Sequence, residues 1–184
     1  ALPHEVMKEA EPPHSPRVLF YAGSSIGNFT PTEALGFLRS VHVACGTAPG
    51  SGLLIGVDLV KDTAELEAAY DDALGVTAAF NLNLLLHINR TLGTDFNVRE
   101  WAHVGLFNTT VSRIEMHLQA RHSLTVRWPG GERAFTSGER IHTENSYKWT
   151  LPGFQALLVN AGFVGSQTWT DPGQRFAVCW ARAL

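Results

Sequence analysis

The chain has 184 residues, and its 14 Lys and Arg against 17 Asp and Glu give a net charge of -3. Hydrophobic residues make up 45%, enough for a core, which excludes general disorder. Charged residues are few and nearly balanced in sign, and the sequence contains no run of basic residues, so we expect no nucleic-acid partner. No long apolar stretch suggests a membrane span, and two cysteines in unrelated contexts exclude a disulfide scaffold. We expect a soluble, cytoplasmic protein.

The chain begins with a strand–helix–strand pattern. Residues 17–22 (RVLFYA) form a continuous apolar run, which is typical of a strand covered on both faces of an α/β sheet. A helix then begins at Thr30 and Pro31, with Glu33 completing a capping box. Residues 53–60 (LLIGVDLV) predict a second buried strand. This order is a βαβ unit, so we expect the two strands to be parallel.

The middle of the chain changes character. Asp62 and Glu65 open a helix that runs to Tyr70, and a second helix is predicted over residues 76–92, with Gly93 as its stop. Antiparallel hairpins are then predicted from alternating residues over 111–118, 123–128 and 132–136. A helix near Thr150 and a hairpin over 164–170 and 175–182 complete the chain.

These elements predict an α/β fold with an inserted α+β segment. We expect a linker or remnant over 1–16, a core over 17–60, an insert over 61–143, and a return to the core over 144–184. Ligands in open α/β sheets bind beyond the carboxyl ends of strands, which places the loop of residues 23–28 (GSSIGN) at a candidate site. A tight strand-to-helix turn would explain the same residues.

A second candidate lies at Glu144 and Ser146. If this segment is a strand, both side chains point to one side, roughly 6–7 Å apart. An acceptor and a hydroxyl at that separation can hold the two nitrogens of an imidazole. A strand-end carboxylate in solvent is the alternative reading of Glu144.

Other polar residues carry weaker signals. The eight histidines fall in separate elements and form no metal-binding spacing, so we expect no metal. Asp71 and Asp72 are adjacent, and adjacent residues on a helix face apart, so we expect a solvated edge or a cap. No Gly-x-Ser-x-Gly element indicates a hydrolase.

Six motifs that occur in one order resemble a single family. They are GSSIGNF (23–29), GVDLVKD (56–62), AYDDALGVTAAFN (69–81), SRIEMHL (112–118), TENSYK (143–148) and WTDP (169–172). The set is similar to the histidine-specific S-adenosylmethionine-dependent methyltransferases that trimethylate the α-amino group of histidine in ergothioneine biosynthesis. The resemblance covers nearly everything from Arg17 to Arg182. It implies the C-terminal part of a Rossmann-like class I methyltransferase sheet, with a substrate domain inserted after its fifth strand.

The resemblance also implies substrate-binding residues. These are Asn28, Tyr70, Thr77, Met116, Glu144 and Ser146. By position, Asn28 would meet the α-amino and carboxylate groups of the substrate, and Tyr70 would bind the carboxylate. Met116 would border the pocket, while Glu144 and Ser146 would hold the imidazole.

The methyl donor is implied in the same way. Gly23 and Ser24 match the loop that passes bound S-adenosylmethionine. The family's glycine-rich motif and the acidic residue that holds the ribose lie upstream in full-length members, and nothing before Arg17 matches them. We therefore expect a fragment that cannot methylate alone and whose partner is the missing N-terminal half or a second copy of the chain.

The function implied is transfer of methyl groups to the α-amino nitrogen of L-histidine, giving hercynine. No catalytic residue is assigned, because an in-line methyl transfer depends mainly on alignment. Two alternatives stay open. One is a related N-methyltransferase of indole or other aromatic amino acids, and the other is a truncated amino-acid-binding module without catalysis.

Overall fold

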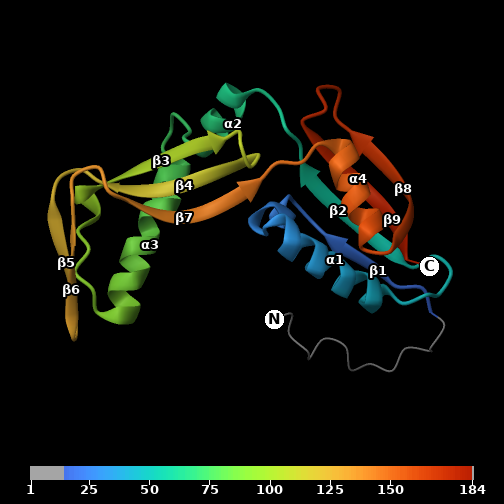
Figure 1. Cartoon of the computed structure of the whole chain (residues 1–184), viewed down its shortest axis with the longest axis horizontal. Helices are drawn as coiled ribbons and strands as arrows, with labels where there is room; N and C mark the ends of the chain where they lie inside the picture. The colour runs from blue at the N-terminus through green and yellow to red at the C-terminus, as the bar shows by residue number, and fades with distance from the viewer. Residues whose placement is uncertain (1–14, 184) are drawn as a thin grey trace. The chain divides into compact units, whose positions relative to one another are not determined.

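The computed structural model describes residues 15–183, so the expected linker over 1–16 lies almost wholly outside the described residues. The chain divides into two compact units. Unit 1 holds residues up to 25, Pro31–Leu59 and the chain from Thr150 onward, and unit 2 holds Ile26–Thr30 and Val60–Trp149. Figure 1 labels the helices and strands of both units.

Unit 1 is built on a four-stranded sheet with the order β1-β2-β9-β8. Its strands are β1 (Val18–Tyr21), β2 (Gly52–Asp58), β8 (Phe163–Thr170) and β9 (Phe176–Ala183). β1 and β2 are parallel, as the βαβ pattern predicted, and the remaining pairs are antiparallel. The fold-class prediction of an α/β protein is confirmed.

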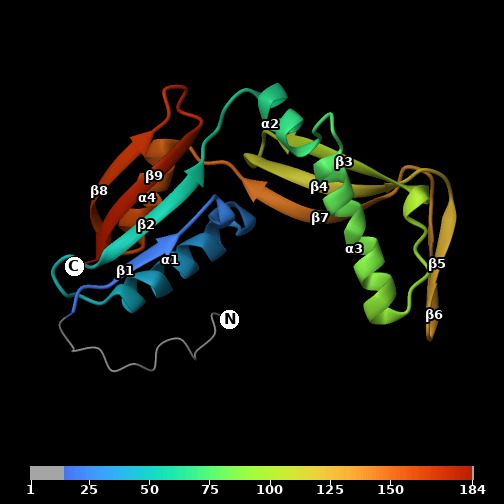
Figure 2. The same ribbon diagram turned by 180° about the vertical axis from the view of Figure 1, so that it is seen from behind.

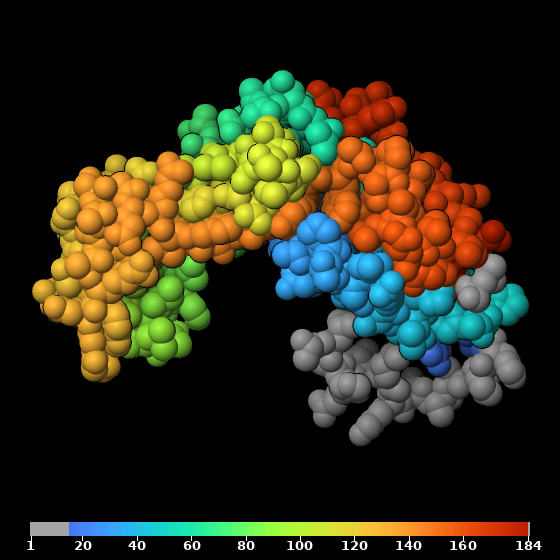
Figure 3. All heavy atoms as spheres, viewed as in Figure 1, coloured from blue at the N-terminus to red at the C-terminus, as the bar shows by residue number. Residues whose placement is uncertain are grey.

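Both helices of unit 1 lie on the same face of this sheet. α1 (Pro31–Cys45) and α4 (Leu151–Asn160) lie in front of the strands in Figure 1 and behind them in Figure 2. In the space-filling view the atoms of these helices cover that face (Figure 3). Phe154 and Leu158 of α4 are fully buried.

The prediction that β1 is covered on both faces is wrong for this chain. Val18 and Phe20 are 59% and 68% exposed, whereas Tyr21 contacts Phe37 of α1. The alternation follows from the one-sided helix layer, because successive side chains of a strand point to opposite faces. A continuous apolar run signals two apolar faces and cannot show whether both are covered within the chain.

Unit 2 contains helices packed on a three-stranded antiparallel sheet, together with a separate hairpin. Its helices are α2 (Thr63–Tyr70) and α3 (Val76–Leu92), and short 3-10 turns occur at η1 (Ser25–Asn28) and η2 (Val98–Glu100). The sheet order is β3-β4-β7, with β3 (Trp101–Asn108), β4 (Arg113–Ala120) and β7 (Arg140–Tyr147). The hairpin pairs β5 (Leu124–Trp128) with β6 (Gly131–Phe135).

Local signals predicted the helix ends of unit 2 well. The Asp62 side chain caps α2 by accepting from the backbone N–H groups of Ala64 and Glu65. α3 ends at Gly93, whose φ of 67° is the left-handed conformation that glycine adopts readily. β3 was not predicted, because all its residues after Trp101 are half-buried and leave no clear alternation.

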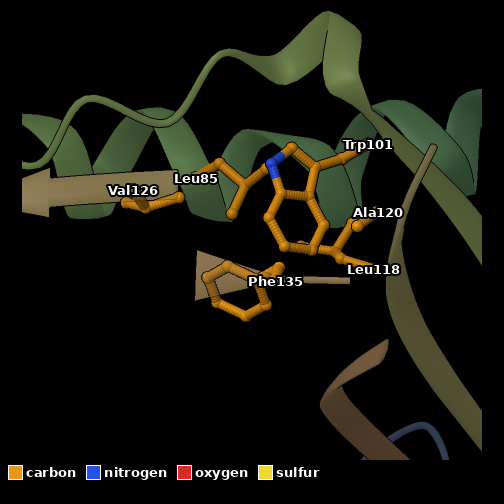
Figure 4. Packing of buried hydrophobic residues seen from close by; sticks show 6 residues of the cluster. All are labelled: Leu85, Trp101, Leu118, Ala120, Val126 and Phe135. Carbon is orange, nitrogen blue, oxygen red and sulfur yellow. The ribbon is translucent and has the colours of Figure 1, made fainter. Parts of the chain in front are cut away.

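The core of unit 2 lies between α3, the sheet and the hairpin. Trp101 lies among Leu85, Leu118 and Phe135 (Figure 4), and it meets the ring of Phe135 edge-on at 5.0 Å between centroids. A second buried cluster beneath α2 consists of Leu66, Ile114 and Met116. Alternate residues of β4 therefore face this helical side, while the residues between them face away.

The boundary expected between residues 143 and 144 needs correction. β7 continues past this point to Tyr147 and pairs with β4 on both sides of Thr143, so residues up to Trp149 stay in unit 2. The short segment Ile26–Thr30, expected in the core, also belongs to unit 2. Among the described residues, no helix is long and apolar enough to cross a membrane.

Candidate functional site

Glu144 and Ser146 lie on one face of β7. Their cross-strand partners on β4 are Met116 and Ile114, both buried under α2. Glu144 is half-buried, and Ser146 is 5% exposed. The strand reading of this segment is thus confirmed, and the solvent-exposed alternative for Glu144 is not what the structure shows.

The segment that carries Asn28 lies against the same strand. A Cβ atom added to Gly27 would stand 2.8 Å from the Tyr147 carbonyl oxygen and 3.3 Å from Ser146 Oγ. Only glycine allows the two backbones to lie this close, because the Tyr147 carbonyl is part of β7 and cannot shift without disturbing the strand. Gly27 thereby brings Asn28 beside β7.

An open pocket of about 280 Å³ forms between these elements. It is lined by Asn28, His142, Thr143, Glu144 and Asn145. Among the described residues, neither the Asn28 amide nor the Glu144 carboxylate makes a side-chain hydrogen bond. Two polar side chains with unused hydrogen-bonding capacity at one concavity are a feature of ligand sites.

The environment of Glu144 disfavours its charge. Burial raises the pKa of Glu144 above its ordinary 4.5, and the positive charge of Lys148 acts in the opposite direction. A half-buried carboxylate without a hydrogen-bond donor is costly, since buried polar groups are normally paired. A ligand N–H would supply the missing donor.

Ser146 belongs to a three-membered hydrogen-bonded cluster with Tyr70 and Lys148. Tyr70 Oη donates to Ser146 Oγ at 2.8 Å. Lys148 Nζ donates to both oxygens, at 2.8 Å each, and lies 4.6 Å from the centre of the Tyr70 ring. Lys148 is 3% exposed, so this cluster is shielded from water.

This cluster fixes the direction of the Ser146 hydroxyl. Ser146 Oγ accepts two hydrogen bonds, one from Tyr70 and one from Lys148, and a hydroxyl oxygen has two acceptor lone pairs. Tyr70 is the donor of the hydroxyl pair because a phenol is a stronger donor than an alcohol. The Ser146 proton is then left to donate to a third group.

Tyr70 is anchored from its backbone as well. Its carbonyl accepts from His103 Nε2 at 2.7 Å, which places the His103 proton on Nε2. His103 Nδ1 then accepts from the Asn81 amide at 3.0 Å, and Asn81 also donates to the His117 carbonyl. The end of α2 is thus tied to β3, β4 and α3.

Two other predicted substrate residues have local structural roles. The backbone N–H of Thr77 donates to Asp72 Oδ1 at 2.8 Å, and Asp72 also accepts from Val76. Asp72 therefore caps the first turn of α3, which was one of the two roles expected for it, the other being a solvated edge. The same bonds lower the pKa of Asp72 to about 2. Met116 is 3% exposed within the apolar cluster under α2. Among the described residues, no contact brings Thr77 to the pocket.

The residues predicted at the methyl donor lie in unit 1, directly after β1. Gly23 has a φ of 64° and is exposed. A side chain at Gly56 of β2 would collide with the Gly23 carbonyl, so this loop packs closely on β2. Ser24 Oγ accepts from the backbone N–H of Asp58 at 2.8 Å, which ties the loop to the carboxyl end of β2.

Sequence reasoning assigned no role to two residues of this site. Lys148 stands in the TENSYK motif, and its spacing of two from Ser146 and four from Glu144 places it on the same face of an extended chain. That periodicity was available as a signal. His103 gave no comparable signal, because its partners Tyr70 and Asn81 come from other elements.

Comparison with known proteins fits this geometry. Residues 4–183 match the family described as histidine-specific, SAM-dependent methyltransferases. The chain is 43% identical over 167 residues to the histidine N-alpha-methyltransferase of Mycolicibacterium smegmatis, and 42% identical over 167 residues to that of Mycobacterium tuberculosis. Both matches cover 90% of this chain and 51% of the relative. Ergothioneine biosynthesis protein 1 of Neurospora crassa is 30% identical over 167 residues, covering 89% of this chain and 18% of that protein.

The family match assigns the chain to the class of S-adenosylmethionine-dependent methyltransferases. The chain belongs to the family of histidine-specific, S-adenosylmethionine-dependent methyltransferases. It spans about half the length of the bacterial relatives that it matches.

Proposed function

We propose that the protein containing this chain transfers methyl groups from S-adenosylmethionine to the α-amino nitrogen of L-histidine, giving hercynine on the route to ergothioneine. The observation that carries the proposal is the pair of side chains on one face of β7. Glu144 has no hydrogen-bond donor among residues 15–183, and the Ser146 hydroxyl has a proton directed by Tyr70 and Lys148. Family membership supports the same assignment.

This pair matches the chemistry of a neutral imidazole. An imidazole offers one N–H donor and one acceptor nitrogen. The Glu144 carboxylate would accept from the N–H, and the Ser146 hydroxyl would donate to the other nitrogen. An indole has one donor and no ring acceptor, so it would leave the Ser146 proton without a partner, at a cost of roughly 1–3 kcal/mol.

We further propose that Asn28 holds the amino-acid end of the substrate. Its amide offers donors to a carboxylate and an acceptor to an amine, and it shares the pocket with Glu144. The role predicted for Tyr70 at the carboxylate stays a prediction. Its hydroxyl proton points to Ser146, so binding a carboxylate would require that proton to turn.

Gly23 and Ser24 are proposed to border the methyl donor. An exposed glycine at the carboxyl end of a parallel strand lets a ligand approach the backbone closely, and the Ser24–Asp58 bond holds that loop in place. The donor supplies an electrophilic methyl group. The chain's own contribution is alignment, because fixing the substrate at both ends limits where its α-nitrogen can point.

The first test is methyl transfer by the full-length gene product. Mass spectrometry would follow products from S-adenosylmethionine with histidine, tryptophan or tyrosine as the acceptor. We expect mono-, di- and trimethylated histidine and little product from the other two. Preference for tryptophan would favour the indole alternative, and the proposal would then be wrong in its substrate.

The second test separates binding from turnover. Calorimetry of histidine with the full-length protein, with and without S-adenosylhomocysteine, measures the pocket directly. Histidine binding without methylation by that protein would favour the binding-module alternative. Assaying the 184-residue chain in parallel tests the expectation that it cannot methylate alone, which a methylated product would overturn.

A further inference from the structure

The face of the β4–β7 pair that points away from α2 carries a second group of polar side chains. Glu115 and His117 alternate along β4, and His142 on β7 stands directly opposite His117. The two imidazole rings are stacked, with centroids 4.7 Å apart and planes at 27°. One ligand-type atom from each of the three residues lies within 4.8 Å of the other two.

A β-bulge creates this juxtaposition. The register of the pair shifts between Met116 and His117, so that Glu144 faces Met116 while His142 faces His117. Regular alternation would place His142 on the same face as Glu144, since the two are separated by an even number of residues. The extra residue moves His142 to the face of Glu115 and His117.

Glu115 presents one oxygen to the histidines. Its Oε1 accepts from Arg113 Nε at 2.8 Å and Arg113 Nη2 at 2.6 Å, and from the Asn108 amide at 3.0 Å. Its Oε2 lies 3.7 Å from His117 Nε2. Hydrogen bonds to the far oxygen are the outer-shell support that metal-bound carboxylates have in proteins.

The histidines show matching features. His142 Nε2 lies 3.1 Å from the Glu144 carbonyl oxygen, and a proton on Nε2 would leave Nδ1 with a lone pair. Metal-bound histidines commonly donate their other N–H to a backbone carbonyl in this way. His117 Nδ1 is buried with no hydrogen-bond partner among the described residues, and so is Asn145 Oδ1 on the residue opposite Glu115.

We propose that Glu115, His117 and His142 form a binding site for a divalent transition-metal ion of the zinc type. Glu115 and His117, two residues apart on β4, and His142 on the neighbouring strand give three metal ligands on one side of the sheet. A fourth coordination position of the metal would stay open. Two imidazoles and one carboxylate are a ligand set that zinc accepts. Zinc–ligand bonds of about 2.0–2.2 Å put tetrahedral ligands about 3.4 Å apart, so the side chains would close by about 1.4 Å at most.

The electrostatics of this face bear on the affinity. The positive charges of Arg113 and Arg140 oppose a cation here, so we expect moderate affinity.

Zinc titration of the tag-free full-length protein tests the proposal. His4 and His14, which lie outside the described residues 15–183, are replaced by Ala throughout so that they do not contribute to zinc binding. We expect one zinc per chain in this titration, and visible absorption of tetrahedral cobalt when Co²⁺ is used instead. His142→Ala and Glu115→Gln should each weaken zinc binding by at least ~10-fold, as loss of even an outer-shell partner does.

Exposed histidines supply the controls. His87→Ala on α3 and His122→Ala after β4 should leave the zinc affinity unchanged, because neither belongs to the cluster. His142 is exposed, so its replacement should not impair folding, which circular dichroism would verify. Equal binding by wild type and His142→Ala, or no binding by wild type, would overturn the proposal. These outcomes are independent of histidine methylation, which is measured separately.

Discussion

Replacing Lys148 by methionine tests the cluster behind Ser146. The substitution keeps an unbranched side chain of similar length in a buried position but removes the ammonium group. Ser146 then loses one of two donors, and its proton can turn toward Tyr70 instead of the pocket. Glu144 also loses the positive charge that counteracts the effect of burial on its pKa.

The effect on stability should be small. Two hydrogen bonds from a charged donor are lost, each contributing roughly 1.5–3 kcal/mol. Methionine avoids the desolvation of a buried cation, which costs several kcal/mol and opposes that loss. The Tyr70–Ser146 bond remains in the variant, so neither oxygen is left without a partner.

The effect on histidine binding should be larger and pH-dependent. Loss of one directed hydrogen bond corresponds to roughly 0.5–1.5 kcal/mol, or about a 2- to 12-fold increase in Kd. Without Lys148, burial alone acts on Glu144 and raises its pKa further. Binding needs the carboxylate, so the loss of affinity on acidification should begin at a higher pH than in wild type.

Calorimetry of the full-length protein with histidine across a pH series measures both effects, with Arg90→Met, which removes an exposed cation of α3, as the control. If the Kd for histidine is unchanged and affinity is lost at the same acid pH as in wild type, the reasoning is refuted, and Lys148 serves the fold alone. If Lys148→Met does not fold, Tyr70→Phe removes the other donor to Ser146 and is expected to weaken histidine binding within the same range.

Three further substitutions have defined outcomes. Glu144→Gln should abolish tight histidine binding yet raise the melting temperature at neutral pH. Because the folded pKa of Glu144 is raised, its stabilising contribution is full below pH 4.5 and is lost as the pH rises through the folded pKa. A melting-temperature difference between variant and wild type that is the same at acid and neutral pH would contradict this. Gly27→Ala should cost roughly 1–3 kcal/mol in denaturant unfolding because its Cβ meets the Tyr147 carbonyl at 2.8 Å, whereas Gly36→Ala, with open space on α1, should be neutral or stabilising. Asp72→Ala should lower the denaturant midpoint of unfolding at neutral pH. Because the folded pKa of Asp72 is lowered to about 2, its stabilising contribution is full above its ordinary pKa of 3.8, and the difference from wild type should vanish as the pH falls from 3.8 toward 2.

Sequence predicted the structure best where short-range chemistry decides it. Asp62 and Gly93 mark helix ends through side-chain capping and a left-handed φ, and both signals act within a few residues. The final hairpin, β8 and β9, was predicted for the same reason, since its turn and its alternation are local. These features require no knowledge of distant contacts.

The same local reading failed where long-range contacts decide. Apolar character alone could not reveal that β1 is covered on one face. Similarly, the histidines looked scattered because His117 and His142 are far apart in sequence, and only the bulged register of β4 and β7 makes them neighbours. The cluster of Tyr70, Ser146 and Lys148 joins the end of α2 to β7. The spacing of Lys148 from Ser146 was a local signal, but the contact of both residues with Tyr70 is long-range and could not be predicted from spacing.

The bulge in β7 is what allows one strand to serve two sites. Beyond it, Glu144, Ser146 and Lys148 alternate on the face that meets α2, where burial and a cation set the charge of Glu144 and the proton of Ser146. Before it, His142 faces the opposite side. Removing the extra residue, by deleting Thr143, would place His142 next to Glu144 in the chain, so that regular alternation alone would keep the two on opposite faces and His142 opposite His117. That deletion should therefore keep zinc binding, whereas His142→Ala should weaken it by at least ~10-fold. Because Thr143 and His142 both line the pocket of Glu144, histidine binding is measured in parallel for each variant.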